Sequence, residues 1–480
     1  MERTLPRAVI AGLSGDSGKT MLSLGLTVAL RSRRLRVAPF KKGPDFIDSA
    51  WAGAAAGVPG RNLDTFLMGE GPILGSVVRA AAGSDIAVIE GNRGLFDGMD
   101  AEGTHCTARL ARLLGAPVVL VVEAYKATRT VAALVKGCQA LDPELWISAV
   151  VINRVGTARQ EALIRQAVKA ETGLEVIGAI PRLPDRLPSR HLGLITAIEH
   201  PAAQETLGNV GRAIEKHVDV SAFIAMAARA PSLQAVEPEQ GEREEAKGSV
   251  RIGVLRDKPF SFYYPENLSE LERCGAELVP ISPLSDDELP DIDALYAGGG
   301  FPELYAEQLS ANRGLLEAIR DRIAQGLPVW AECGGLMYLS ESLIVKGSVH
   351  PMVGALKVAV EQTSRPQGHG YVEAVVDGAN PFLEQGTGLR GHEFHYSRIL
   401  DEGRQLSTVL KLNRGTGVGG KRDGIVAGNV LATYTHLHAL GMPGWAPSIV
   451  RAANGSHSRG ASTKKKAQVV RQHEAMSDWR

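Results

Sequence analysis

The sequence feature that most restricts the fold is a glycine-rich segment between a short apolar run and an apolar helical stretch. The apolar run covers residues 7–12 and is typical of a buried strand, and the helical stretch covers residues 21–30. The residues that join them read GLSGDSGKT, from Gly12 to Thr20. A strand, a glycine loop, Gly-Lys-Thr and a helix occur in this order in phosphate-binding loops. The segment therefore predicts an α/β domain that binds a nucleotide.

The residue types of this loop suit the phosphates of ATP. Backbone N–H groups and the helix N-terminus would cradle the phosphates, while Lys19 would neutralise their charge. The hydroxyl of Thr20 would reach a bound Mg²⁺ ion. The alternative interpretation is a glycine-rich turn without a ligand. The candidate ATP-binding residues in this loop are Gly12, Gly15, Ser17, Gly18, Lys19 and Thr20.

The loop departs from the strict pattern at one position. That pattern has a glycine six residues before the lysine, where this chain has Leu13, and Gly12 lies one place earlier. This offset loop resembles that of P-loop proteins of the dethiobiotin-synthetase type.

Charged residues follow two more apolar runs in the first half of the chain. Residues 37–40 lead into the loop KKGPDFID, and residues 86–89 lead into Glu90. Ligands of open α/β sheets bind at the carboxyl ends of the parallel strands. Glu90 is therefore a candidate Mg²⁺ ligand, and Asp97 in the next glycine-rich loop is a candidate polar group over the reacting centre. The alternatives are a solvated charged loop and an acid that caps the next helix.

A reactive cysteine is the main candidate in the second half. An apolar run ends at Ala331, and Cys333 is followed by two glycines and a helix-like apolar stretch. A sharp turn from strand to helix would hold the cysteine in an unusual backbone geometry, and the glycines would keep the neighbouring backbone close. The helix N-terminus would also favour the thiolate. The alternative is a buried structural cysteine.

Two other segments suit the chemistry of a cysteine nucleophile. A predicted strand at residues 294–297 runs into a glycine triplet whose N–H groups could form an oxyanion hole, although a flexible turn is the alternative. The candidate oxyanion-hole residues are Gly299, Gly300 and Gly334. An extended segment at residues 430–438 carries His436 and His438. A lone histidine is more often structural, but two at a strand end in a domain with a Cys-Gly-Gly turn favour catalysis.

The length and the order of apolar segments predict two α/β domains. A chain of 480 residues usually forms two or more domains. Strands that alternate with helical segments predict doubly wound, mainly parallel sheets. A polar, turn-rich stretch marks a linker between them. We expect a first domain at 1–229, a linker at 230–249, a second domain at 250–454 and a disordered basic tail at 455–480.

The composition argues against several classes of protein. The formal net charge is zero and the pI is about 7.2, so no electrostatic argument favours a nucleic-acid or membrane partner. The 4 cysteines are widely scattered and form neither a disulfide framework nor a metal cluster. No apolar run approaches the ~20 residues of a membrane span, and the N-terminus lacks an apolar signal region. The expected location is the cytoplasm.

These motifs together resemble the cobyrinate a,c-diamide synthase family of glutamine-dependent amidotransferases. The resemblance rests on the P-loop, on FKKGPDFID at 40–48, on Glu90 to Gly98, on DKPFSFYYPENL at 257–268, and on the segments around Cys333 and His436. It covers about residues 7 to 450. It implies an N-terminal P-loop synthetase domain of the dethiobiotin-synthetase type and a C-terminal class I glutaminase domain.

The resemblance also implies a division of roles between the two domains. Cys333 would attack the glutamine amide and form a thioester, and His436 would shuttle the proton. The released ammonia would replace phosphate on a carboxylate that ATP has activated. Phosphate binding would fall to Lys19, Thr20 and Lys41, and Mg²⁺ binding and substrate activation to Thr20, Asp48, Glu90 and Asp97.

One position departs from the pattern of class I glutaminases, which have a glutamate two residues after the histidine. Here His438 occupies that position, so the third member of the triad stays open and a dyad is an alternative. The expected partners are glutamine, ATP and a carboxylate-bearing tetrapyrrole, with homodimer formation left open.

The substrate and the class of protein also have alternatives. The same chemistry on sirohaem or nickel-sirohydrochlorin is one, and amidation of other ring positions, as in cobyric acid synthase, is another. A regulatory P-loop ATPase with an inactive glutaminase-like module is the non-enzyme alternative. Ser14 stands where such ATPases carry a second lysine, which argues against that class.

Overall fold

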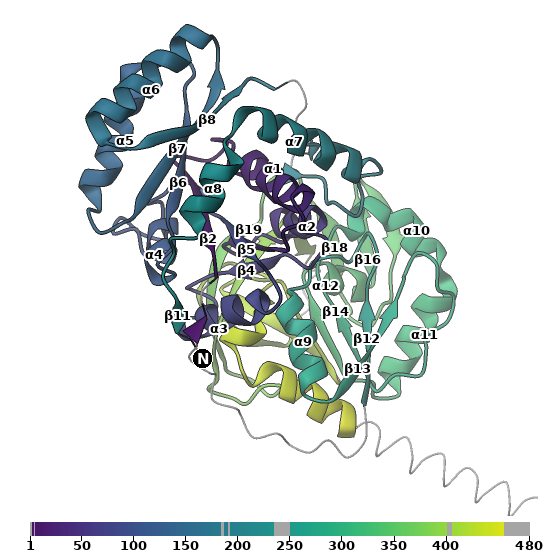
Figure 1. The fold of residues 1–480 in the computed structure, drawn as a ribbon. Helices are drawn as coiled ribbons and strands as arrows, with labels where there is room; N and C mark the ends of the chain where they lie inside the picture. The colour runs from purple at the N-terminus through teal and green to yellow at the C-terminus, as the bar shows by residue number, and fades with distance from the viewer. Residues whose placement is uncertain are drawn as a thin grey trace, which may run out of the picture. The chain divides into compact units, whose positions relative to one another are not determined.

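The computed structural model describes residues 2–3, 5–183, 187–190, 193–234, 250–400 and 406–455. The chain divides into two compact units, Met1–Gln240 and Gly241–Arg480 (Figure 1). The predicted basic tail lies outside the described residues beyond position 455, and so does most of the predicted linker. None of the helices in the described ranges combines the length and apolar character that a membrane span requires.

The first unit is built on a seven-stranded parallel sheet. Its strand order is β4-β3-β5-β2-β6-β7-β8. The strands are β2 (Arg7–Gly12), β3 (Val37–Lys42), β4 (Arg61–Leu63), β5 (Ile86–Glu90), β6 (Val118–Glu123), β7 (Ile147–Val155) and β8 (Glu175–Pro181). Because all of these strands are parallel, their carboxyl ends meet at one edge. The P-loop follows β2, which lies between β5 and β6, where the chain switches from one side of the sheet to the other.

Helices cover this sheet and supply its core. An apolar cluster packs one face against α1 (Lys19–Ser32), α2 (Phe46–Ala56), α7 (Ala203–His217) and α8 (Val220–Ala227). Figure 1 shows α1 and α7 side by side. The remaining helices of this unit are α3 (Glu70–Ala81), α4 (Thr107–Leu113), α5 (Arg129–Leu141) and α6 (Ala158–Thr172).

Short strand pairs complete the first unit. β9 (Ser189–Arg190) pairs with β10 (Gly193–Leu194). β1 (Glu2–Arg3) pairs with β11 (Leu233–Gln234), so residues beyond the expected domain end at 229 belong with this unit. We therefore propose that the connection between the units lies within 235–249.

The second unit contains a mixed ten-stranded sheet in the order β13-β12-β14-β15-β24-β23-β22-β19-β20-β25. The parallel half consists of β12 (Val250–Leu255), β13 (Ala276–Ile281), β14 (Ala294–Ala297), β15 (Val329–Glu332) and β24 (Val430–Thr433). The antiparallel half consists of β19 (Gly368–Val376), β20 (Gly388–His395), β22 (Thr408–Arg414), β23 (Arg422–Ala427) and β25 (His436–Leu437). The predicted α/β class and parallel sheets are confirmed, and the antiparallel half is an addition that the sequence did not predict.

Alternation along the strands separates two cores in this unit. Val329 and Ala331 face one apolar cluster, whereas Trp330 between them faces the other. The helical elements include α9 (Pro265–Arg273), η1 (Pro302–Tyr305), α10 (Ala306–Ala311), α11 (Arg313–Ala324), α12 (Gly334–Leu339) and η2 (Ala439–Gly441), and a further helix covers 445–455. A separate four-stranded sheet contains β16 (Ser342–Val345), β17 (Ser348–Pro351), β18 (Ala359–Gln362) and β21 (Ser397–Leu400).

Candidate active sites

The P-loop of the first unit is closed by contacts that need glycine at two positions. A Cβ atom added at Gly12 would lie 2.0 Å from Oγ of Ser17. Gly18 has a φ of 99°, in the left-handed region, and a Cβ atom there would lie 2.1 Å from Nδ2 of Asn153. The same Asn153 amide donates to the carbonyl of Ser17 at 2.9 Å. The loop is therefore tied to the end of β7, and the offset position of Gly12 is a steric requirement.

The loop presents a helix N-terminus and a lysine to an anion. Gly18 precedes α1 and has no side chain with which to cap its first N–H groups, which suits a phosphate. Lys19 donates to the carbonyl of Ser14 at 2.8 Å and to Oγ of Ser17 at 3.3 Å, so it curls over the loop. Burial, followed by repulsion from Lys41, lowers the pKa of Lys19. The negative charge of an arriving phosphate would favour the charged form of Lys19 and so offset both effects.

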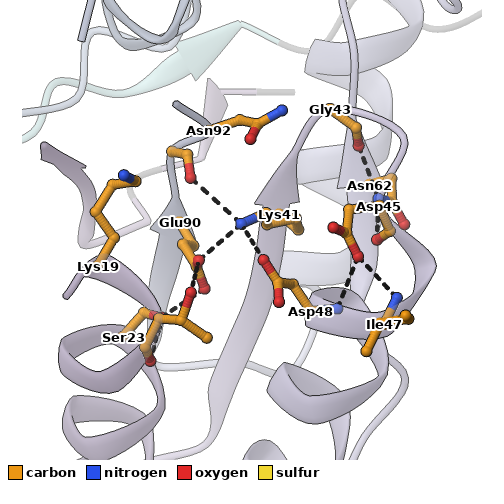
Figure 2. Close-up of polar contacts among 12 residues, drawn as sticks. Lys19, Ser23, Lys41, Gly43, Asp45, Ile47, Asp48, Asn62, Glu90 and Asn92 are labelled. Carbon is orange, nitrogen blue, oxygen red and sulfur yellow. Dashed lines mark hydrogen bonds and ion pairs between the residues drawn. The ribbon is translucent and has the colours of Figure 1, made fainter. Parts of the chain in front are cut away.

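A buried charge network connects the P-loop to β3 and β5 (Figure 2). Lys41 lies between two carboxylates, with its Nζ 2.5 Å from Oδ2 of Asp48 and 2.7 Å from Oε1 of Glu90. The side chains of Lys41 and Glu90 are 4% and 2% exposed. Burial alone would lower the pKa of Lys41, but the two carboxylates outweigh it and raise that pKa. Lys41 is thus held fully charged at this edge of the sheet.

Two hydroxyl groups complete the network at Glu90. Thr20 donates to Oε1 of Glu90 at 2.6 Å, and Ser23 donates to Oε2 at 2.7 Å. Ser23 was not among the sequence candidates, and its position one turn after the Gly-Lys-Thr signal could have indicated it. The structure therefore brings together the P-loop, Lys41, Asp48 and Glu90.

Asp97 lies in the loop that follows β5 and helps to shape it. Its Oδ2 accepts from the N–H of Gly94 at 2.8 Å. The N–H of Leu95 donates to the carbonyl of Gly12 at 2.7 Å, so this loop touches the P-loop. Asp97 therefore stabilises the conformation of its own loop through this hydrogen bond. A role over the reacting centre stays a proposal.

The oxygen atoms beside the P-loop are of the type that Mg²⁺ prefers. Thr20 and Glu90 present a hydroxyl and a carboxylate side by side, and Asp48 is joined to Glu90 through Lys41. No group of three or more His, Cys, Asp or Glu side chains suited to a metal occurs within the described ranges. A Mg²⁺ ion here would therefore take most of its ligands from nucleotide phosphates and water, as is usual for this ion.

Cys333 of the second unit lies on a sharp turn between β15 and α12. Its φ is 48°, which confirms the predicted unusual backbone geometry. Its N–H donates to the carbonyl of Thr433 at 2.7 Å, which fixes the turn to β24. A Cβ atom at Gly335 would lie 2.1 Å from the carbonyl oxygen of Ala297, so only glycine lets α12 approach β14 this closely.

The expectation that the helix N-terminus favours the thiolate is wrong for this structure. Burial, and then the charge of Glu303, raise the pKa of the Cys333 thiol, and a hydrogen bond from the N–H of Gly334 offsets this only in part. α12 spans only 6 residues, and the thiol is 5% exposed, so desolvation outweighs the helix. The thiol therefore needs a base to remove its proton.

His436 is oriented by a carboxylate that directly precedes the cysteine. Its Nδ1 lies 3.2 Å from Oε2 of Glu332, and Oε1 of Glu332 accepts from Nε1 of Trp330 at 2.9 Å. The Cε1–Nε2 edge of the ring faces the glycine triplet, since a Cβ atom at Gly299 would lie 2.4 Å from Cε1 and 3.3 Å from Nε2 of His436. The ring therefore presents Nε2 on the side of the predicted oxyanion hole.

The three candidate oxyanion-hole glycines lie next to one another. A Cβ atom at Gly334 would lie 3.0 Å from the backbone N of Gly300 and 3.3 Å from the carbonyl carbon of Gly299. The N–H of Gly298 already donates to the hydroxyl of Tyr263 at 2.8 Å. Gly298 is therefore not a donor to an oxyanion. For Gly299, Gly300 and Gly334 that role stays a proposal.

The residues around His436 include two that the sequence did not assign. Glu332 was missed, although an acid at the end of a strand and next to a candidate nucleophile is a usable signal. His392 stacks on His436, with ring centroids 4.9 Å apart. Burial, followed by the neighbouring histidines, holds the pKa of His392 well below its usual value.

Comparison with known proteins finds a matching domain family in each unit of the chain. Residues 8–195 match the model of the CobQ/CobB/MinD/ParA nucleotide binding domain, and residues 251–443 match that of the CobB/CobQ-like glutamine amidotransferase domain. The chain is 43% identical over 461 residues to "Cobyrinate a,c-diamide synthase" of Magnetococcus marinus, covering 94% of this chain and 98% of the relative.

Two further relatives carry the same name. The one from Archaeoglobus fulgidus is 44% identical over 439 residues, covering 91% of this chain and 95% of the relative. The one from Syntrophotalea carbinolica is 42% identical over 462 residues, with 94% and 99% covered. The likeness therefore extends over both units.

Proposed function

The chain belongs to the cobyrinate a,c-diamide synthase family, and on that premise we propose that it amidates the a and c acetate carboxylates of cobyrinic acid. The reaction would consume ATP and glutamine. The observation that carries the proposal is the presence, in one chain, of a P-loop charge network, a strained Cys333 and a His436 that is held by a carboxylate. A carboxylate oxygen is a poor leaving group, so activation by ATP and delivery of ammonia are both needed.

The second unit would supply the ammonia. His436 would take the proton of Cys333, and the thiolate would attack the amide carbon of glutamine. Backbone N–H groups at Gly299, Gly300 and Gly334 would stabilise the oxyanion. The C–N bond would break as ammonia leaves with the proton from His436, and water would then hydrolyse the thioester to glutamate.

The first unit would activate the carboxylate. The P-loop, Lys19 and Lys41 would hold the phosphates of ATP, and the carboxylate would attack the γ-phosphorus with loss of ADP. A Mg²⁺ ion at Thr20 and Glu90 would supply neutralisation of phosphate charge. Ammonia would then displace phosphate and form the amide. Asp48 would keep Lys41 charged and oriented.

The decisive experiment incubates the purified chain with cobyrinic acid, ATP and glutamine and analyses the product by mass spectrometry. We expect two amide groups and two ADP molecules per cobyrinic acid. Product formed only from sirohaem or nickel-sirohydrochlorin would overturn the substrate. Absence of both glutamate release and ADP formation with any of the three macrocycles would overturn the assignment as an amidotransferase.

A further inference from the structure

The geometry around His436 points to a third member of the glutaminase triad that does not come from position 438, where class I glutaminases have their glutamate. We propose that Glu332, which directly precedes the nucleophile, is the residue that positions His436 for proton transfer. This inference rests on the proposed glutamine hydrolysis at Cys333. Glu332 would act through the histidine, without contact to glutamine.

Glu332 is held in place from two further sides. Its Oε1 accepts from the indole N–H of Trp330 at 2.9 Å, and its Oε2 faces Nδ1 of His436 at 3.2 Å. Burial, followed by the charge of Glu332, raises the pKa of the Tyr296 hydroxyl, so this hydroxyl lies near the carboxylate. The Glu332 side chain is 2% exposed. A carboxylate so buried, with its oxygens facing fixed donors, is a rigid support for an imidazole ring.

Position 438 is engaged elsewhere. Nε2 of His438 lies 3.8 Å from Oε2 of Glu266, and its Nδ1 accepts from the N–H of Leu440 at 3.3 Å. Its ring packs against Tyr264, with centroids 4.5 Å apart. His438 therefore helps to hold α9 against the segment after β25, and the acid that faces the catalytic histidine comes from β15.

The carboxylate selects one tautomer of His436. An ionised carboxylate only accepts hydrogen bonds, so the neutral ring must carry its proton on Nδ1. Nε2 then carries the lone pair, on the Cε1–Nε2 edge that faces Gly299, and with it His436 would take the proton of Cys333. Once His436 is charged, Glu332 stabilises the imidazolium, which is the role of the acid in a Ser-His-Asp triad.

The Trp330 contact makes Glu332→Gln a sharp test. Indole N–H is a donor only, so the glutamine carbonyl oxygen must face Trp330 and the amide NH₂ must face His436. That NH₂ would donate to Nδ1 and force the proton onto Nε2. His436 would then be unable to accept a proton from Cys333. The substitution therefore does more than remove a charge, because it reverses the tautomer.

The test measures the glutamine-dependent and ammonia-dependent reactions of the full-length variants. For Glu332→Gln we expect kcat for glutamine hydrolysis to fall by about 10³–10⁴-fold, as for a triad forced into the wrong tautomer. KM for glutamine and the ammonia-dependent synthesis should stay within about threefold of the wild type. ¹⁵N NMR of the histidines should show His436 protonated on Nε2 instead of Nδ1.

A second substitution should reverse the effect. In Glu332→Gln/Trp330→Phe no indole N–H fixes the amide, so it can flip and offer its oxygen to Nδ1. We expect kcat to rise at least about tenfold above that of Glu332→Gln, although Trp330→Phe alone should lower kcat. The matched control is Glu266→Gln, which alters the carboxylate beside His438 and should leave kcat within about threefold.

The outcomes separate this inference from the proposed function. Wild-type protein that releases no glutamate from glutamine would overturn the proposed function itself. Active wild type with Glu332→Gln within about threefold of its kcat, or with an unchanged His436 tautomer, would overturn only the role of Glu332. If the double variant does not fold, the NMR spectrum of the single variant still decides between the two tautomers.

Discussion

At the scale of single residues, Cys333 combines a strained backbone with a thiol that burial keeps protonated. Its reactivity must therefore come from His436 once glutamine is bound. We expect Cys333→Ala to lower glutamine-dependent synthesis by about 10⁴-fold or more, because no thioester can form. Synthesis from added ammonium chloride should stay within about twofold of the wild type. Loss of both activities in a folded variant would contradict the division into two sites.

Lys41 offers a second prediction, on stability. Lys41→Met would leave the buried Glu90 and the partly buried Asp48 without their shared cation. Removing one partner of a buried ion pair costs about 3–5 kcal/mol in the free energy of unfolding, which we expect in denaturant titrations of the first unit. The control is Lys169→Met, which breaks an exposed pair with Glu175 and should cost under about 1 kcal/mol. Adding Glu90→Gln to Lys41→Met should recover part of the loss, and no recovery would argue against this origin.

His392 gives a prediction on pH. Its pKa in the folded chain is well below 6.5, so as the pH falls below 6.5 the unfolded chain binds a proton that the folded chain does not. The free energy of unfolding of the second unit should therefore decrease as the pH is lowered below 6.5. This residue would contribute up to about 1.4 kcal/mol per pH unit. His392→Gln should remove that part of the slope in urea titrations at pH 7.5, 6.0 and 5.0. An equal slope in both proteins would show that His392 is not the group responsible.

The sequence predicted which residue types would meet at each site but not how they pair. Lys41 and Glu90 were identifiable because each ends a strand of a parallel sheet. Their direct contact depends on side-chain rotamers, which a sequence pattern does not contain. Glu332 was missed because its partner lies 104 residues away, and their meeting depends on β15 and β24 being neighbours.

At the scale of elements, the loop after β14 and the first residue of β25 meet without space for a side chain at position 299. We expect Gly299→Ala to lower kcat for glutamine hydrolysis by about 10²-fold, because the new methyl group would lie 2.4 Å from Cε1 of His436 and would displace the ring. Ammonia-dependent synthesis should be unaffected. Gly388→Ala in β20, where no atom lies within 4 Å of the added Cβ, is the matched control. Equal activity of the two variants would show that His436 can move without loss.

Element boundaries were predictable where the apolar runs were short and bounded by glycine or charge. The expected strand at 7–12 matches β2, and that at 294–297 matches β14. The antiparallel half of the second sheet was not predicted. β20 interrupts its few apolar residues with glycine, histidine and charged residues, and only the second half of β19 is mainly apolar. Strand identity there comes from pairing with distant neighbours, which local pattern does not reveal.

At the scale of the whole molecule, the two sites belong to units with separate sheets and separate cores. The first core is built from α1, α2, α7, α8 and the parallel strands, and the second unit has two cores of its own. The sequence indicated this division through its polar stretch, since 237–245 interrupts the apolar pattern on both sides. Energetic coupling between distant sites without shared partners is usually small.

We therefore expect each unit to respond to its own substitutions. Lys41→Met should increase amide hydrogen exchange in β3 and β5 while leaving β15 and β24 as in the wild type. Gly335→Ala should do the reverse, because its methyl group would lie 2.1 Å from the carbonyl oxygen of Ala297 and push α12 away from β14. Peptide-level mass spectrometry of exchange would measure both. If either substitution raised exchange equally in both sheets, the units would unfold as one cooperative body, and the stability predicted for Lys41 would have to be assigned to the whole chain.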